Sequence, residues 1–227
     1  MSVIEHLEAL RRALIISAVA WAIATVIAWF FSSTVYELLL HRANIPRAYV
    51  FDPPGAFFLR LKVALYLGFV LSAPVIIQQG WWFVSPGLYL HERRLFAPLI
   101  LATIFFFALG IGFALFSLPL IMRVLTGFAS ADVVYFPDAT RLLGFILALV
   151  IGFGIVFELP VILWVLGRMG IISSRWLYKN HAYWIIGLGL LANILTPGAD
   201  PLTPMIMFVP LLVFWEGTAL LLKMTGR

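Results

Sequence analysis

The chain has 227 residues, of which 63% are apolar and 11% are charged. Soluble domains carry about 45–50% apolar and about 25% charged residues. The 15 basic and 10 acidic side chains are too few to cover the surface of a soluble protein of this size. The mean hydropathy of +1.08 agrees. Composition therefore excludes a soluble globular domain and predicts an integral membrane protein.

Charge and residue usage exclude several function classes. The formal net charge is +5, and the chain has four histidines and no cysteine. A thiolate nucleophile, a disulfide framework and a cysteine-based metal site are excluded, and no H-x-x-x-H spacing indicates a metal centre. We expect no cofactor, and we interpret the basic excess as a signal of membrane topology rather than of nucleic acid binding.

Long charge-free runs predict six transmembrane helices, because a bilayer core of about 30 Å needs roughly 20 apolar residues in a helix. We expect an all-α membrane protein with a single integral domain, 1–227. The predicted spans are 13–36, 63–83, 95–122, 142–167, 182–195 and 205–222. Helices five and six are predicted to be short, so the bilayer must thin there or protein must shield them.

The distribution of lysine and arginine predicts the orientation. With the amino terminus inside, nine basic residues lie on the cytoplasmic side and six lie outside, which favours cytoplasmic termini. The first apolar run is too long for a cleavable signal peptide and indicates a signal anchor. Three G-x-G pairs, at 110/112, 152/154 and 187/189, are interpreted as sites of close helix packing.

Glu158 is the most informative residue, because apolar residues flank it on both sides within the fourth span. A carboxylate at that depth costs about 2.5–3.5 kcal/mol on insertion scales, so it should face a cavity or a partner. The alternative is a protonated glutamate that is hydrogen-bonded inside the bundle. Pro160 predicts a kink immediately after it.

Three other acids have plain structural interpretations. Glu216 lies close enough to Lys223 to extend toward the membrane edge. Glu92 can pair with a neighbouring arginine, which composition alone favours over ligand binding. Glu8 and Arg12 are four residues apart and can form an ion pair on one helix.

Several motifs, taken together in order and spacing, resemble the TatC family, the multispanning receptor subunit of the twin-arginine protein translocase. The resemblance runs nearly end to end. The motifs are His6-Leu7 with Leu10-Arg11; Phe57-Phe58 with Lys62; Ser72-Ala73-Pro74-Val75-Ile76; Phe83-x-x-Pro86-x-Leu88-Tyr89-x-His91-Glu92-Arg93-Arg94; Gly154-x-x-Phe157-Glu158-x-Pro160-Val161; and Thr196-Pro197, Asp200, Pro210 and Glu216.

The resemblance implies a cup-shaped six-helix receptor, not an enzyme, in the cytoplasmic membrane of a prokaryote. It would bind twin-arginine signal peptides and export folded proteins with the proton-motive force. Partners would be single-span proteins resembling TatA and TatB, in a homo- or hetero-oligomer. The implied signal-peptide residues are Glu92, Phe83, Pro86, Leu88, Arg11 and Glu8.

The resemblance also implies an intramembrane site and a docking edge. Glu158 and Pro160 would meet the signal peptide or the partners, and Thr196, Pro197, Asp200 and Glu216 would dock the partners. Several positions differ from the family pattern, among them Ala9, which stands where the family usually has a glutamate. Glu8 is displaced from it by one residue, about 100° around a helix.

Two other function classes fit the sequence less well. A proton-coupled small-molecule transporter could use Glu158, but only Asn193 and Thr196 come near it as further polar groups. An intramembrane hydrolase is disfavoured because G-x-S-x-G, H-E-x-x-H and a pair of intramembrane aspartates are all missing from the sequence.

Overall fold

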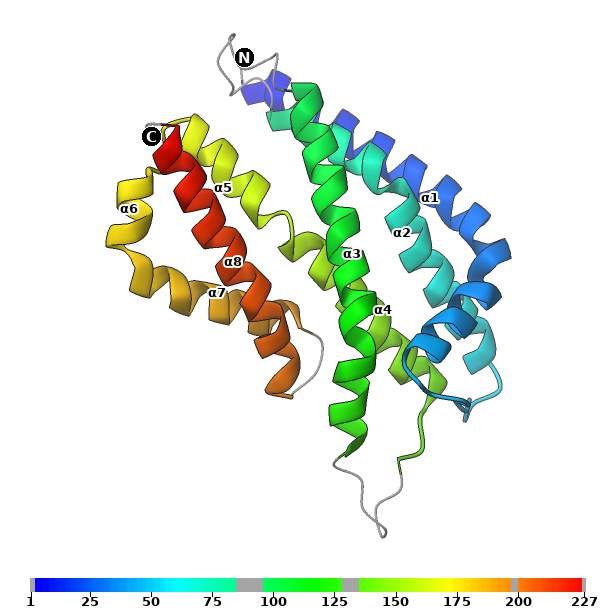
Figure 1. The fold of residues 1–227 in the computed structure, drawn as a ribbon. Coiled ribbons are helices and arrows are strands. Elements are labelled where there is room, and N and C mark those ends of the chain that lie inside the picture. Colours follow the sequence, from blue (N-terminus) through cyan, green and yellow to red (C-terminus); the bar gives the residue numbers. More distant parts are fainter. Residues whose placement is uncertain (1–2, 85–95, 128–134, 197–199, 226–227) are drawn as a thin grey trace. The chain divides into compact units, whose positions relative to one another are not determined.

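The structure is a computed structural model that describes residues 3–84, 96–127, 135–196 and 200–225 (Figure 1). Within these ranges the regular elements are helices, apart from one isolated bridge between Tyr49 and Asp138. The helices are α1 (Val3–Arg42), α2 (Gly55–Val84), α3 (Phe96–Gly127), α4 (Ala139–Val156), α5 (Leu159–Arg168), α6 (Ser174–Lys179), α7 (His181–Leu195) and α8 (Leu202–Met224). The predicted all-α membrane fold is confirmed.

Among the described residues, five helical stretches are long and apolar enough to cross a membrane: α1, α2, α3, the run formed by α4 with α5, and α8. The shorter apolar helix, α7, has 15 residues, or about 22 Å, in line with the predicted short fifth span. The sixth, α8, is longer than predicted, with 23 residues. It exceeds 205–222 because the helix starts before the apolar run, at Leu202, and continues through Lys223.

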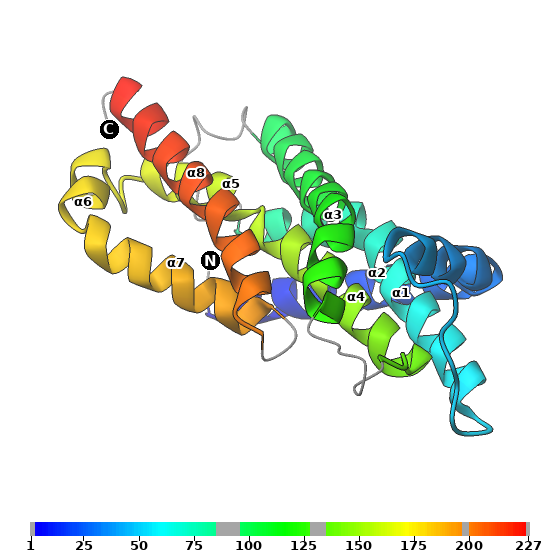
Figure 2. The ribbon, with the colours of Figure 1, turned by 60° about the horizontal axis from the view of Figure 1, so that its bottom comes forward.

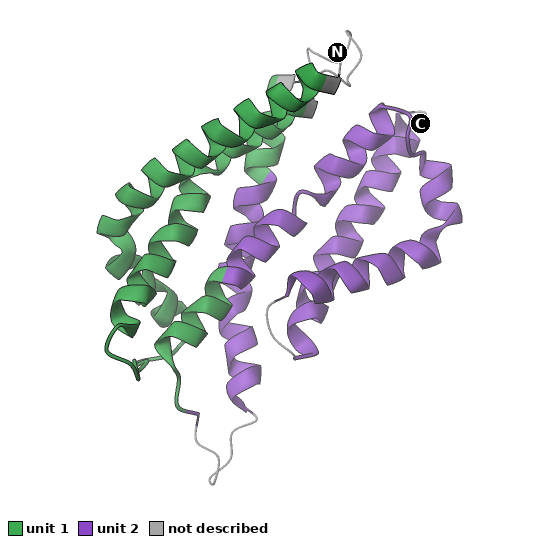
Figure 3. Ribbon diagram, turned by 180° about the vertical axis from the view of Figure 1, so that it is seen from behind, with its two compact units in different colours: residues 1–105, 136–147 green, residues 106–135, 148–227 purple. Residues whose placement is uncertain are grey.

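The chain forms two compact units (Figure 3). Unit 1 contains residues 1–105 and 136–147, and unit 2 contains residues 106–135 and 148–227. Unit 1 therefore holds α1, α2, the start of α3 and the first half of α4. Unit 2 holds the rest, and within it α6 and α7 meet at a corner beside α8 (Figures 1 and 2).

In unit 1, α1 packs closely against α2. A Cβ atom on Gly68 would lie 2.7 Å from the Thr25 Cα, so only glycine permits this approach of the two backbones. Near one end of the pair, the Arg60 guanidinium lies over the Trp29 ring, 5.3 Å from its centroid. The Trp21 indole N–H donates to the Leu65 carbonyl across the same interface, at 2.9 Å.

The two long connections of unit 1 meet at the start of α4. The Tyr49 N–H donates to the Pro137 carbonyl at 3.0 Å, and the Ala139 N–H donates to the Tyr49 carbonyl at 2.8 Å. The Asp138 carboxylate accepts from the Arg141 N–H at 2.7 Å, which satisfies one of the first-turn donors of α4. Tyr49 also stacks on Phe136, with ring centroids 4.1 Å apart.

In unit 2, α3 and α4 approach closely at glycine. A Cβ atom on Gly110 would lie 2.5 Å from the Phe153 carbonyl oxygen. Gly152 and Gly154 are similarly confined, whereas Gly112 and Gly187 face open space. The packing interpretation of the G-x-G pairs is therefore correct for 110, 152 and 154 and wrong for 112 and 187.

Candidate functional site

A groove of about 360 Å³ lies between the start of α1 and the end of α2, and we call it the N-terminal groove. Its lining residues are Glu5, Glu8, Ala9, Arg12, Ala13, Ile16, Gln79, Trp82 and Phe83. The α1 residues follow a spacing of three and four, so they occupy one face of the helix. All of them belong to unit 1.

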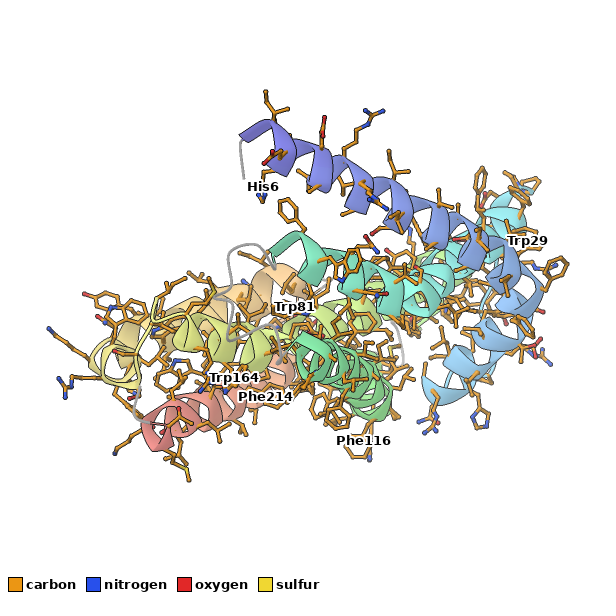
Figure 4. The ribbon with its side chains drawn as sticks, turned by 90° about the horizontal axis from the view of Figure 1, so that it is seen from above. His6, Trp29, Trp81, Phe116, Trp164 and Phe214 are labelled. Atoms are coloured by element: carbon orange, nitrogen blue, oxygen red, sulfur yellow. The ribbon has the colours of Figure 1, made fainter. Side chains whose placement is uncertain are left out.

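The aromatic residues at the end of α2, which form one wall of the groove, are held by contacts with α1 and with α3. His6 projects from α1 and stacks on Phe83, with ring centroids 4.4 Å apart and an interplanar angle of 28° (Figure 4). The Trp81 indole N–H donates to the Thr103 hydroxyl at 2.9 Å, which ties the end of α2 to α3 within unit 1. Trp82 is 57% exposed.

The groove combines the groups that bind a guanidinium. The carboxylates of Glu5 and Glu8 can accept two parallel N–H bonds from its planar fork, and the Trp82 and Phe83 rings can stack against its face. A lysine ammonium would lose the bidentate geometry.

The predicted signal-peptide residues fall into three groups. Glu8 and Phe83 line the N-terminal groove. Arg11 is exposed on α1, and the neighbouring Arg12 lines the groove instead. Three further predicted residues lie outside the described residues: Pro86, Leu88 and Glu92.

Sequence reasoning missed seven lining residues: Glu5, Ala9, Arg12, Ala13, Ile16, Gln79 and Trp82. Those on α1 carried a usable signal, because Glu5, Glu8 and Arg12 follow helical spacing and define one face. Those on α2 had no comparable signal, since the end of that span mixes glutamine, glycine and aromatic residues without a repeated spacing.

The intramembrane site is a break in a helix. The α4 helix ends at Val156, and α5 begins at Leu159 with proline in its first turn, as the predicted kink requires. Pro160 has no N–H, so the Val156 carbonyl does not receive a helical hydrogen bond from it. At the break, the Glu158 N–H donates to the Ile155 carbonyl, three residues earlier, at 3.1 Å. Glu158 is half-buried at the break.

Aromatic rings surround this break within unit 2. Phe157 is buried, and its ring meets Phe214 of α8 edge to face at 4.7 Å and lies 5.4 Å from the Phe113 ring. The Phe214 ring in turn meets the Phe106 ring edge to face, with centroids 5.8 Å apart. The polar turn at Glu158 is therefore supported by a tightly packed apolar cluster.

Two of the predicted docking residues, Thr196 and Asp200, form hydrogen bonds at the end of α7 and the start of α8. The Thr196 hydroxyl is buried and donates to the Ala192 carbonyl at 2.6 Å. One Asp200 oxygen accepts from the N–H groups of Leu202 and Thr203, at 3.1 and 2.7 Å, and from the Thr203 hydroxyl at 2.8 Å. Asp200 thus caps α8. Pro197 lies outside the described residues.

Glu216, the remaining predicted docking residue, is exposed on α8. Its Oε1 atom accepts a hydrogen bond from the Tyr178 hydroxyl of α6 at 3.2 Å. Desolvation, then the hydrogen bond and the charge of Glu216, raise the pKa of Tyr178 above its usual 10.0. The pair links α6 to α8.

These features define a multi-pass α-helical membrane protein with an acidic and aromatic groove at its amino-terminal end and a half-buried glutamate at a helix break.

Comparison with known proteins names the family. The family model described as Sec-independent protein translocase protein (TatC) matches residues 5–210. The TatC protein of Aquifex aeolicus is 36% identical, over 100% of this chain and 97% of its own length. That of Carboxydothermus hydrogenoformans is also 36% identical, over 98% and 93%.

A crystal structure of the twin-arginine translocase receptor TatC superposes with a TM-score of 0.82 at 35% identity, over 98% of this chain and 100% of that one. This chain belongs to the TatC family. It is a component of the Sec-independent, twin-arginine pathway of protein translocation, and the resemblance described from its motifs is confirmed.

Proposed function

We propose that this protein is the receptor and core subunit of the twin-arginine translocase. It binds twin-arginine signal peptides at its cytoplasmic face and assembles with single-span partners resembling TatA and TatB. The complex exports folded proteins across a prokaryotic cytoplasmic membrane with the proton-motive force. Both termini lie in the cytoplasm, as the excess of basic residues on that side indicates.

The N-terminal groove carries this proposal. It sets the carboxylates of Glu5 and Glu8 beside the rings of Trp82 and Phe83, a combination suited to two adjacent guanidinium groups. The motif that resembles the family adds Glu92, which lies outside the described residues, as a further carboxylate. Glu8 takes the part that a glutamate plays at the position of Ala9 in other family members.

The test uses crosslinking of a synthetic twin-arginine signal peptide to the full chain in membranes. Glu8→Gln and Glu92→Gln should each reduce crosslinking about ten- to a hundredfold, since a hydrogen bond to a charged group is worth about 1.5–3 kcal/mol. The twin-lysine peptide should crosslink weakly to wild type. Glu37→Gln is the matched control, because Glu37 is an exposed glutamate at the far end of α1.

Unchanged crosslinking in both variants would remove these carboxylates from the receptor site. Equal crosslinking of the twin-arginine and twin-lysine peptides would contradict guanidinium recognition.

Glu158 and Pro160 contact the signal peptide or the partners within the membrane. The partners dock at Thr196, Pro197, Asp200 and Glu216. Glu158 is supported by its half-buried place at a helix break and by the motif Phe157-Glu158-x-Pro160 that resembles the family. Glu158→Ala should weaken capture of the single-span partners while the circular dichroism spectrum stays unchanged. Normal capture and normal export would return Glu158 to a structural role.

A further inference from the structure

A second hollow, of about 380 Å³, lies where α6 meets α7 in unit 2, and we call it the aromatic corner. Its lining residues are Trp176, Asn180, Tyr183, Trp184 and Gly187. The rings of Trp176 and Trp184 meet edge to face at 5.9 Å and form its wall. A Cβ atom on Gly187 would meet nothing within 4 Å, so the hollow is open at that position.

The corner stands at the end of an apolar helix that is too short for a bilayer core. The 15 residues of α7 span about 22 Å, so lipid must adapt to it. Tryptophan and tyrosine concentrate where membranes meet water, because each has an apolar ring and a polar group. Tyr183 is 77% exposed and Trp176 is 46% exposed, as such a boundary allows.

The charge next to the corner is basic. Arg175 and Lys179 are exposed on α6, one residue before Trp176 and Asn180 respectively, so they form the adjacent row of the same helix. From 159 to 199 the chain contains no aspartate or glutamate. The acid that reaches α6 is Glu216 of α8, and it accepts the hydrogen bond of Tyr178, which is outside the lining.

We propose that the aromatic corner binds one anionic phospholipid. Arg175 and Lys179 attract the phosphodiester, the indole N–H groups of Trp176 and Trp184 can donate to its headgroup and ester oxygens, and the first carbons of an acyl chain lie over Gly187. A lipid suits this surface better than a soluble protein segment, because anionic charge and a long apolar chain match the basic row and the apolar helix that meet there. This proposal is independent of signal-peptide binding.

The test is native mass spectrometry of the full-length protein in detergent, titrated with phosphatidylglycerol or phosphatidylcholine. Wild type should retain phosphatidylglycerol in preference. Gly187→Leu, which fills the hollow, and Arg175→Gln with Lys179→Gln, which removes the charge, should each lower the phosphatidylglycerol-bound fraction roughly tenfold. Gly217→Leu is the matched control, since a Cβ atom there also meets nothing within 4 Å.

Several outcomes would overturn the proposal. They are wild-type retention by Gly187→Leu, equal retention of both lipids by wild type, displacement of the lipid by millimolar inorganic phosphate, and a co-purified protein bound at the corner in place of lipid. If Gly187→Leu does not fold, the double glutamine variant decides, because both of its altered side chains are exposed.

Discussion

The His6 imidazole stacks on the Phe83 ring, 4.4 Å between centroids, and so joins the first turn of α1 to the last turn of α2. Phe83 lines the N-terminal groove, whereas His6 is not one of its lining residues. The stack therefore fixes one wall of the groove without occupying the space that a peptide would enter.

Loss of the stack should weaken peptide binding moderately. His6→Ala removes a ring pair worth about 0.5–1.5 kcal/mol, so the affinity for a labelled twin-arginine peptide should fall about two- to tenfold in fluorescence anisotropy. His6→Phe keeps an aromatic ring and should restore most of the affinity. If the alanine and phenylalanine variants bind equally well, ring stacking has no part in shaping the wall.

The cap on α8 should control the stability of its first turn. Asp200→Ala removes the acceptor for two backbone N–H groups and one hydroxyl, at a cost of about 1 kcal/mol. Hydrogen exchange at Leu202 and Thr203 should quicken, and Asp200→Ser should show a smaller change. Asp52→Asn, in unit 1, is the control. Exchange as slow as in wild type would show that the turn is held by other contacts.

The break at Glu158 should close when its proline is removed. Pro160→Ala supplies an N–H for the Val156 carbonyl, so α4 and α5 can join, and stability should rise by about 1 kcal/mol in thermal unfolding. The chain has no cysteine, so spin labels can be attached at single introduced cysteines. Labels at Phe116 and Ile171, both exposed in unit 2, will report the change at the break between α4 and α5.

The distance distribution between those labels should shift in Pro160→Ala, and export of a twin-arginine reporter should fall. An unshifted distribution would mean that the packing around Phe157, rather than the proline, maintains the break.

The interaction between Tyr178 and Glu216 should be detectable as a raised pKa of the Tyr178 phenol in an alkaline titration. The absorbance difference between wild type and Tyr178→Phe should give a pKa above 10.0, and Glu216→Ala should lower it. A raised folded pKa means that the neutral phenol stabilises the fold. That contribution is complete below the unfolded pKa of about 10 and is lost as pH rises through the folded pKa. A midpoint insensitive to Glu216→Ala would contradict the linkage.

The sequence was sufficient for the helices and for single residues with strong local chemistry. Pro160 predicted the break beside Glu158 because proline cannot donate a hydrogen bond inside a helix. The apolar run 182–195 predicted a short helix because it has fewer residues than a bilayer core needs. The end of α8 was harder, since apolar runs show where lipid lies rather than where a helix stops.

The N-terminal groove was only partly predictable. Glu8 and Phe83 were predicted from the sequence. The packing of their two helices against each other is tertiary structure, which a local sequence pattern does not encode. The open hollow at Gly187 could not be foreseen for the same reason: a glycine in a helix has the same local pattern whether it faces a neighbouring backbone, as Gly110 does, or open space.

Unit 1 is discontinuous in the chain, because residues 136–147 belong to it although most of α3, which precedes them, belongs to unit 2. The bridge between Tyr49 and Asp138 closes that unit across almost ninety residues of chain. During synthesis the first two helices must therefore wait in the lipid, without this closure, until the ribosome has delivered the start of α4. The early helical hairpin is the stage at which biogenesis is most exposed to misassembly or proteolysis.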